Sequence, residues 1–430
     1  MTANTKSRRL FSKLNLVIFA VIFAVIGGYI ILNSFAATPA SSSVDHVVPY
    51  DSASPWNQPI PANVQVDSNS TNNIQFLSSL NKGLTSDVTT CTVPVYIFDS
   101  TTPRADVTIY GNYREYLTSD SSESENTKPA RNVAIPSVAA AEQGCDGQIE
   151  FWNPTTGEQF GFWLFGGNTS TGYHAENGYH YFTKAGFYGR FAGGHAGRGA
   201  GTPYLAGLVR PWELYQGRID HAIAFAYEYP CCGTQSSAAA PKTFVYPAAK
   251  SDGASSNLNS APEGARFQLN PNLTDAQIQN SPTHATTPGL GCTGPCFTIA
   301  KALQKYGMYS IDNSGSSKIY LEDNNSANWD LSALGVSTAS AIRNIPSKLT
   351  PNNDWSNFRV VAPPCNPVTT TCSTTPTPKP GDTNGDNLVN IVDLSTLLSH
   401  WNAIFTAADF NSDGTVNIVD LSILLSNYGK

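Results

Sequence analysis

Oxygen-bearing side chains occur twice near the C-terminus at the spacing of a calcium-binding loop. In such a loop the ligands fall at positions 1, 3, 5, 7, 9 and 12, because a hard cation needs many oxygens around it. The first segment supplies Asp382, Asn384, Asp386, the Leu388 carbonyl, Asn390 and Asp393. The second supplies Asp409, Asn411, Asp413, the Thr415 carbonyl, Asn417 and Asp420. The two segments predict two bound Ca²⁺ ions, with the side chain at position 9 ligating directly or through water.

The chain must turn tightly at position 6 of each loop and then enter a regular element. Gly414 tolerates the positive φ that this turn favours, and Asn387 does so less freely. After each loop, leucines at i, i+3 and i+4 predict short helices over 393–401 and 420–428. We expect the helices to bury these leucines against each other, forming a small α-helical calcium-binding module over 382–430. The leucines are Leu394, Leu397, Leu398, Leu421, Leu424 and Leu425.

The two copies share the run Val-Asn-Ile-Val-Asp-Leu-Ser, and Pro378 and Pro380 prevent a helix before the first loop. On these features, residues 382–430 resemble a type I dockerin, the module that docks secreted polysaccharide-degrading enzymes onto cohesin domains of a scaffold. The resemblance implies calcium binding and a cohesin partner. Loop positions 10 and 11, where many dockerins carry hydroxyl or charged residues that select the cohesin, are apolar in both copies: Ile391, Val392, Ile418 and Val419. The near-identity of the copies allows binding in two orientations related by a half-turn.

Candidates for catalysis in the central region are carboxylates near predicted strands. Asp220 and His221 precede an apolar strand at 222–226, and Glu150 lies in another predicted strand beside Trp152. A glycosidase needs two carboxyl groups, one as acid and one as base or nucleophile, and His221 would tune a pKa. The alternative is structural: Asp220 caps a turn, His221 is a satisfied core histidine, and Glu150 lies on a solvated face. The spacing leaves both interpretations open.

A second candidate group is rich in histidine. It fits either a metal site or a His/Tyr pair that removes a sugar-ring proton, as in a polysaccharide lyase. Its members are His174, Glu176, His180 and His195. The arginines that would neutralise a uronate carboxylate are Arg190, Arg198 and Arg210. The alternative is an exposed aromatic loop, since the stretch is Gly-rich and lacks the His-Glu-x-x-His spacing of a helical zinc site.

The central region, 45–363, has mainly the pattern of β structure. Short apolar or alternating runs predict strands at 93–99, 105–110, 148–153, 159–164, 222–229, 243–246, 266–269, 308–311, 319–321 and 358–361. Helical patterns are fewer, at 74–80, 297–306 and 338–345. This pattern favours a β-sandwich or jelly-roll-like body with a few helices. Segments such as 54–61 and 262–269 resemble secreted bacterial proteins of unassigned activity, a resemblance that carries no mechanism.

Composition excludes some classes of protein. Charged residues are 13% of the 430, against about 25% in average domains, and the net charge is −7. Nucleic-acid binding is not expected, because no Lys/Arg cluster occurs beyond the first residues. An even number of cysteines, 8, predicts disulfides in an exported protein, and Cys365 and Cys372 flank a short loop of their own. The spacing of Cys292 and Cys296 does not match a zinc site.

The N-terminus predicts export. Lys6, Arg8 and Arg9 precede an uncharged apolar run at 16–32. Ser34 and Ala36 fit signal-peptide cleavage, whereas the length of the run fits an uncleaved transmembrane anchor, which would be the chain's one membrane contact. We therefore expect an extracellular or cell-surface protein. The predicted divisions are a signal peptide or anchor at 1–37, a short linker at 38–44, the body at 45–363, a Pro/Thr linker at 364–381 and the module at 382–430.

Together these features predict an exported polysaccharide-degrading enzyme, an O-glycosyl hydrolase, docked to a cohesin scaffold through calcium-dependent contacts. The hydrolase assignment depends on what dockerins usually carry and not on a catalytic motif. Two alternatives remain open: a polysaccharide lyase, and a non-catalytic carbohydrate-binding or cell-surface component.

Overall fold

The computed structural model describes residues 46–111, 114–116, 130–183, 197–232, 244–253, 255–364, 380–383, 388–403, 405, 407–411 and 415–429. They form two compact units, the body ending at Pro364 and the C-terminal module beyond it. The predicted export segment, the 38–44 linker and most of the Pro/Thr linker lie outside the described residues. Within the described ranges, no helix has both the length and the apolar character needed to cross a membrane.

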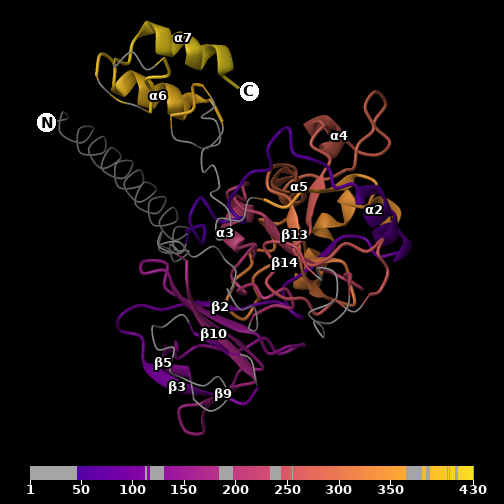
Figure 1. Ribbon diagram of the computed structural model, residues 1–430, viewed down its shortest axis with the longest axis vertical. Helices are drawn as coiled ribbons and strands as arrows, with labels where there is room; N and C mark the ends of the chain where they lie inside the picture. Colours follow the sequence, from indigo (N-terminus) through magenta and orange to yellow (C-terminus); the bar gives the residue numbers. More distant parts are fainter. Residues whose placement is uncertain are drawn as a thin grey trace, which may run out of the picture. The chain divides into compact units, whose positions relative to one another are not determined.

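A six-stranded mixed sheet forms one half of the body, where β13 and β14 lie beside α5 (Figure 1). Its strands, in spatial order, are β1 (Thr85–Asp87), β14 (Lys318–Tyr320), β11 (Ile223–Tyr227), β13 (Met308–Asn313), β12 (Arg266–Leu269) and β15 (Phe358–Val361). β11 pairs in parallel with β13 and antiparallel to β14. A parallel pair needs a long crossover, and the connection from β11 to β13 contains β12 and the helix α5 (Pro295–Lys305).

Helices cover one face of this sheet. They are α2 (Ser70–Ser79), α4 (Asp275–Gln279), α5, and the 3₁₀ segments η2 (Ala339–Leu349) and η3 (Pro351–Asn353). Because side chains alternate along a strand, Phe225 points into this helical layer, where it packs with Phe267 and Trp355. Leu77 of α2 and Leu303 of α5 belong to the same buried core. Burial of these apolar side chains stabilises the helices against the sheet.

Two further sheets form the other half of the body (Figure 1). The five-stranded sheet contains β2 (Val95–Ile97), β6 (Ile149–Trp152), β7 (Glu158–Trp163), β10 (Asn177–Phe182) and β4 (Arg114–Tyr116). The four-stranded sheet contains β5 (Ala130–Ala134), β3 (Arg104–Ile109), β9 (Gly172–Ala175) and β8 (Gly166–Asn168). A shared core joins the two sheets and includes Phe151, Phe160 and Phe162 from one, with Val107 and Val133 from the other. This half is a β-sandwich.

The two halves meet through a third core. Phe151 points into the sandwich, whereas the next residue, Trp152, packs in a cluster with Ala224, Tyr309 and Tyr320 of the six-stranded sheet. The body therefore has four layers: helices, the six-stranded sheet, the five-stranded sheet and the four-stranded sheet. The five-stranded sheet is buried on both faces, and polar side chains that lie on it are enclosed.

The prediction of a mainly β body with a few helices is confirmed. The strands expected at 266–269 and 358–361 coincide with β12 and β15, whereas the run at 243–246 contributes only an isolated bridge at Phe244. The alternative that 174–180 form an exposed loop is wrong, because β9 and β10 contain most of this stretch. Tyr179 and Tyr181 of β10 are buried. Burial of these two tyrosines in the third core favours a strand here, whereas the Gly-rich sequence around them suggested a loop.

Disulfides are confirmed, and they connect Cys91 to Cys145, Cys231 to Cys232, and Cys292 to Cys296. The remaining two cysteines, Cys365 and Cys372, lie outside the described residues.

The C-terminal module consists of α6 (Ile391–Ser399) and α7 (Ile418–Asn427) packed on a small core. Leu397 and Leu424 are fully buried in it. Leu398 and Leu425, expected in the core, are instead 51% and 54% exposed. That expectation is wrong because two helices this short bury only a narrow stripe, and successive helical residues are rotated by about 100°.

Candidate functional site

Glu150 lies on β6 and is fully buried between the two halves of the body. The Tyr179 hydroxyl donates a hydrogen bond of 2.5 Å to Glu150 Oε2 and accepts one of 2.7 Å from the Tyr204 backbone N–H. Burial raises the pKa of Glu150 well above its usual range, although Tyr179 and the charge of Arg198 oppose this. Burial therefore favours the neutral form of this carboxyl. The alternative that Glu150 lies on a solvated face is wrong.

His221 is also buried, at the entrance to β11. Its Nδ1 lies 2.8 Å from the Ala222 carbonyl oxygen and its Nε2 lies 3.0 Å from Glu213 Oε1. Both ring nitrogens thus face acceptors, which suits the imidazolium. The Asp220 carboxylate, which is partly exposed, pairs with Arg218 Nε at 2.6 Å. Asp220 and His221 are neighbours as expected, but within the described part of the chain neither forms a hydrogen bond or ion pair with Glu150.

Glu213 is a partner that sequence reasoning missed. It lies on the short helix α3 (Pro211–Tyr215), where its Oε2 accepts the backbone N–H of Arg210 at 2.8 Å. One local pattern could have identified it. Glu213 stands three residues after Arg210, the residue that precedes the helix, and this is the spacing of a capping box. Its other oxygen binds His221, so one carboxylate ties α3 to the start of β11.

The histidine group is divided between two sheets. His174 is exposed on β9 of the four-stranded sheet. His180 lies on β10 of the five-stranded sheet, 3.0 Å from Glu158 and stacked on Phe160. His195 and Arg190 lie outside the described residues, and Arg210 pairs with Glu322. Among the described residues, His174 and His180 belong to no cluster that could hold a metal.

Arg198 and Lys318 place two cations between the halves of the body. The Arg198 guanidinium lies over the Tyr320 ring at 4.0 Å and donates through Nη2 to the Tyr204 carbonyl at 2.8 Å. Lys318 Nζ donates to the Cys91 carbonyl at 2.7 Å. Burial lowers the pKa of Lys318 to about 8, against the opposing charge of Asp312. Sequence reasoning named Arg198 for its charge alone and missed Lys318, because no local pattern marks a buried lysine.

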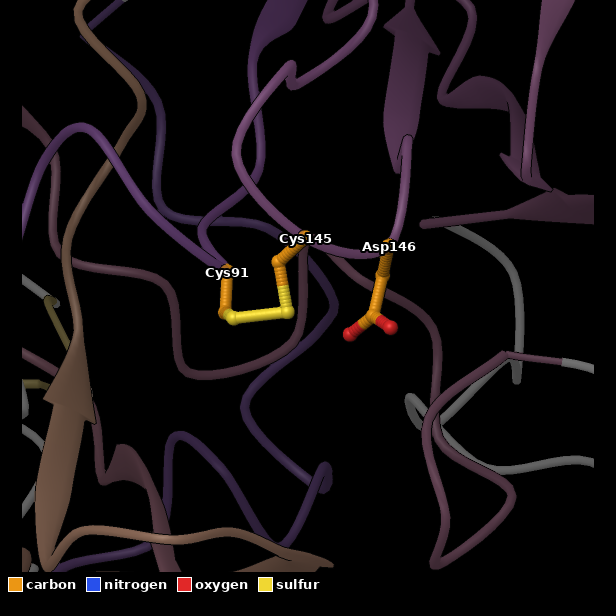
Figure 2. A group of neighbouring side chains, drawn as sticks. All are labelled: Cys91, Cys145 and Asp146. Carbon is orange, nitrogen blue, oxygen red and sulfur yellow. A yellow bond between two sulfur atoms is a disulfide. The ribbon is translucent and has the colours of Figure 1, made fainter.

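The Cys91–Cys145 disulfide holds the neighbouring loop near Lys318. Figure 2 shows the Asp146 carboxylate beside the two bonded sulfur atoms. One ligand atom from each of these three residues lies within 4.8 Å of the other two, a spacing that a metal ion could bridge. The two sulfurs are bonded to each other, however, and are not thiolates that could bind a metal. The charge of Asp146 opposes the lowering of the Lys318 pKa by burial. We therefore assign this group to the structure of the loop.

In the C-terminal module, Asp393 ties together the two ends of the first loop. It is fully buried at the start of α6, where Oδ1 accepts the Thr383 N–H at 2.9 Å and Oδ2 accepts the Asn390 N–H at 2.9 Å. Asn390 caps the helix, because its Oδ1 accepts the Val392 N–H at 2.8 Å. Two predicted ligands of this loop, Asn384 and Asp386, lie outside the described residues.

Asp420 has the same role in the second loop. Its Oδ1 accepts the Phe410 N–H at 2.7 Å and its Oδ2 accepts the Asn417 N–H at 2.9 Å. Asn417 caps α7 through a 2.8 Å bond from the Val419 N–H. Asp413 lies outside the described residues. The two copies are thus alike in hydrogen bonding as well as in sequence.

The donor chemistry of the loops fits calcium. Asp393 and Asp420 are fully buried carboxylates, and within the described ranges neither forms an ion pair with lysine or arginine. A buried carboxylate needs a compensating charge. The predicted ligands are all oxygens, which Ca²⁺ prefers, so the loop residues would hold the ion and Asp393 and Asp420 would close its coordination from the helix side.

The comparisons with known proteins concern this module. Residues 380–427 match the family model described as Dockerin type I domain. The C-terminal module is a type I dockerin. A dockerin of this type binds calcium and docks onto a cohesin, so the chain is a cohesin-docking component, and proteins with such a module are typically extracellular or on the cell surface. No curated protein and no solved structure matches the chain.

The dockerin exposes apolar side chains at equivalent positions of its two copies. Ile391 is 62% exposed and Ile418, its counterpart, is 65% exposed. The other exposed pairs are Val392 and Val419, Leu398 and Leu425, and Trp401 and Tyr428. Single exposed apolar residues are common, but a repeated set on two packed helices and directly after them is typical of a binding surface.

Proposed function

We propose that this chain is an exported O-glycosyl hydrolase whose dockerin attaches it to a cohesin-bearing scaffold. The observation that carries the docking part is the repeated exposed apolar set on α6 and α7, directly after the two loops. Calcium would hold each loop closed, and the loop closure would position the first turn of each helix for the cohesin.

The dockerin can bind in two orientations under this proposal. Loop positions 10 and 11 are Ile-Val in both copies, and both pairs are exposed to a similar extent. A half-turn that exchanges the copies would therefore present nearly the same apolar surface to the cohesin. Two Ca²⁺ ions, one in each loop, would be needed to keep the two surfaces alike.

The body would hydrolyse glycosidic bonds of a polysaccharide. Support comes from the dockerin, whose usual cargo is polysaccharide-degrading enzymes, and from two carboxyl groups in different environments. Burial favours the protonated form of Glu150, which is the form that a general acid needs, and the Asp220 carboxylate reaches solvent. His221 would position the Asp220 segment. Because Glu150 is fully buried, residues above it must move before it can reach a substrate.

A product assay tests this proposal. The full chain is incubated with neutral and acidic polysaccharides, and the products are identified by mass spectrometry. New reducing ends on saturated sugars support hydrolysis, whereas an unsaturated uronate absorbance on acidic polymers would indicate a lyase instead. Retained binding to insoluble polysaccharide with no product from any polymer would contradict the enzymatic part and leave a docked binding component.

A further inference from the structure

Three carboxyl groups from separate segments of the body converge near one end of β13. One oxygen from each of Asp252, Glu263 and Asp312 lies within 4.8 Å of the others. Asp252 is exposed on a loop, Asp312 lies on β13, and Glu263 is fully buried just before β12. The group thus extends from the surface into the interior.

The backbone around the three residues holds them in place. The Asp252 N–H donates to Glu263 Oε2 at 3.1 Å, and the Asn313 N–H donates to Asp252 Oδ1 at 3.2 Å. Gly199 lies so close that a Cβ there would stand 2.5 Å from the Asp252 carboxyl carbon. A bulge in the pairing of β11 with β13 immediately precedes Asp312, and bulges commonly redirect the side chain that follows.

The three acids lack a compensating cation in direct contact. None of them forms an ion pair with lysine or arginine among the described residues. Glu263 Oε1 is buried and has no hydrogen-bond partner there. An unpartnered buried oxygen beside two further acids indicates a missing positive ligand.

We propose that Asp252, Glu263 and Asp312 bind a divalent cation, with Ca²⁺ the expected ion. Ca²⁺ takes oxygen ligands at about 2.3–2.6 Å, so two ligands on opposite sides of one ion lie about 4.6–5.2 Å apart. The separation of at most 4.8 Å fits a single shared ion. Asp252 at the surface provides the route of entry. The site is separate from the dockerin loops, and its existence does not depend on the proposed hydrolase activity.

The test uses the full chain with both dockerin loops disabled by Asp382→Ala and Asp409→Ala. Ca²⁺ binding is measured by equilibrium dialysis, and the Tm of the body is compared in EDTA and in 10 mM CaCl₂. We expect one bound ion per chain and, for a Kd of about 10⁻⁴–10⁻³ M, a Tm rise of about 2–4 °C. Adding Asp252→Asn should abolish both effects, and this exposed conservative change is a low risk to folding.

The matched control is Asp275→Asn, which removes an exposed carboxylate that pairs with Lys301 and is not a member of the cluster. It should keep the ion and the Tm rise. A second variant, Glu263→Gln, should weaken Ca²⁺ binding at least tenfold if it folds. The proposal is overturned if the loop-disabled chain binds no Ca²⁺, or if Asp252→Asn binds it as tightly as its parent.

Discussion

The Nε2 atom of His221 lies 3.0 Å from Glu213 Oε1, and both side chains are buried. Burial alone would lower the pKa of His221, but the charge and hydrogen bond of Glu213, with the Ala222 carbonyl and Asp220, outweigh it and raise the pKa. The folded chain therefore keeps a proton on His221 at pH values where the unfolded chain has released it.

The first prediction is a pH dependence of stability. The contribution of this pair is fully present below about pH 6.5, the ordinary pKa of histidine, and is lost as pH rises through the raised pKa. Glu213→Gln should cost about 1–3 kcal/mol of unfolding free energy at pH 6 and less at pH 9. Urea unfolding at both pH values checks this, with exposed His284→Gln as the control. An equal cost at both pH values would show that the imidazolium is not involved.

The second prediction concerns calcium in the dockerin. Chelation should unfold α6 and α7, because Asp393 and Asp420 would then be buried charges without a cation. Asp393→Ala should weaken Ca²⁺ binding at least tenfold, since it removes a ligand and three hydrogen bonds that close the loop. Hydrogen exchange of the two helices measures the effect, and Ser422→Ala on an exposed position of α7 is the control. Helices equally protected in EDTA would refute it.

The third prediction concerns the two orientations of docking. Ile391→Asp or Ile418→Asp alone should weaken cohesin binding only about twofold, because the other copy still presents its surface. The double substitution should weaken it at least 100-fold, since a charge then opposes the apolar contact in both orientations. Calorimetry with a type I cohesin measures this, and Leu258→Asp, at an exposed site of the body, is the control. A single substitution that abolishes binding would rule out the second orientation.

The fourth prediction tests the catalytic roles proposed for the carboxyl groups of Asp220 and Glu150. Asp220→Asn should reduce product formation at least 100-fold while lowering the free energy of unfolding by no more than about 1–2 kcal/mol. Glu150→Gln keeps the shape of the side chain and should also suppress product, because the amide supplies no catalytic proton. Product rates and urea unfolding are measured on the same samples. Unchanged rates in both variants would exclude this pair and leave the catalytic residues elsewhere.

Local spacing was enough to predict the dockerin. The ligand positions, the capping residues Asn390 and Asn417 and the helices all lie within a dozen residues of one another, and the hydrogen bonds to Asp393 and Asp420 follow from that proximity. Even so, Asn390 starts α6 two residues earlier than its leucine pattern suggests. The cap, and not the apolar periodicity, decides where a helix begins.

The body was predictable only to the level of its strands. β12 and β15 appear in the sequence as short apolar runs, but nothing local shows that β11 lies between β13 and β14 or that the five-stranded sheet is covered on both faces. For that reason the sequence alone allowed Glu150 to lie on a solvated face. The pattern of a strand shows which side chains lie on the same face of a sheet. Which segment covers that face depends on packing against parts of the chain that are distant in sequence.

By itself, then, the sequence determined the calcium loops, the dockerin family and the β character of the body, because each depends on residues close together in the chain. Only the tertiary structure decided that Glu213 holds His221, that Arg198 and Lys318 are enclosed, and that Asp252, Glu263 and Asp312 meet. These groups come from segments separated by loops, helices and strands. Their meeting is set by how the layers bury apolar surface, which no local spacing records.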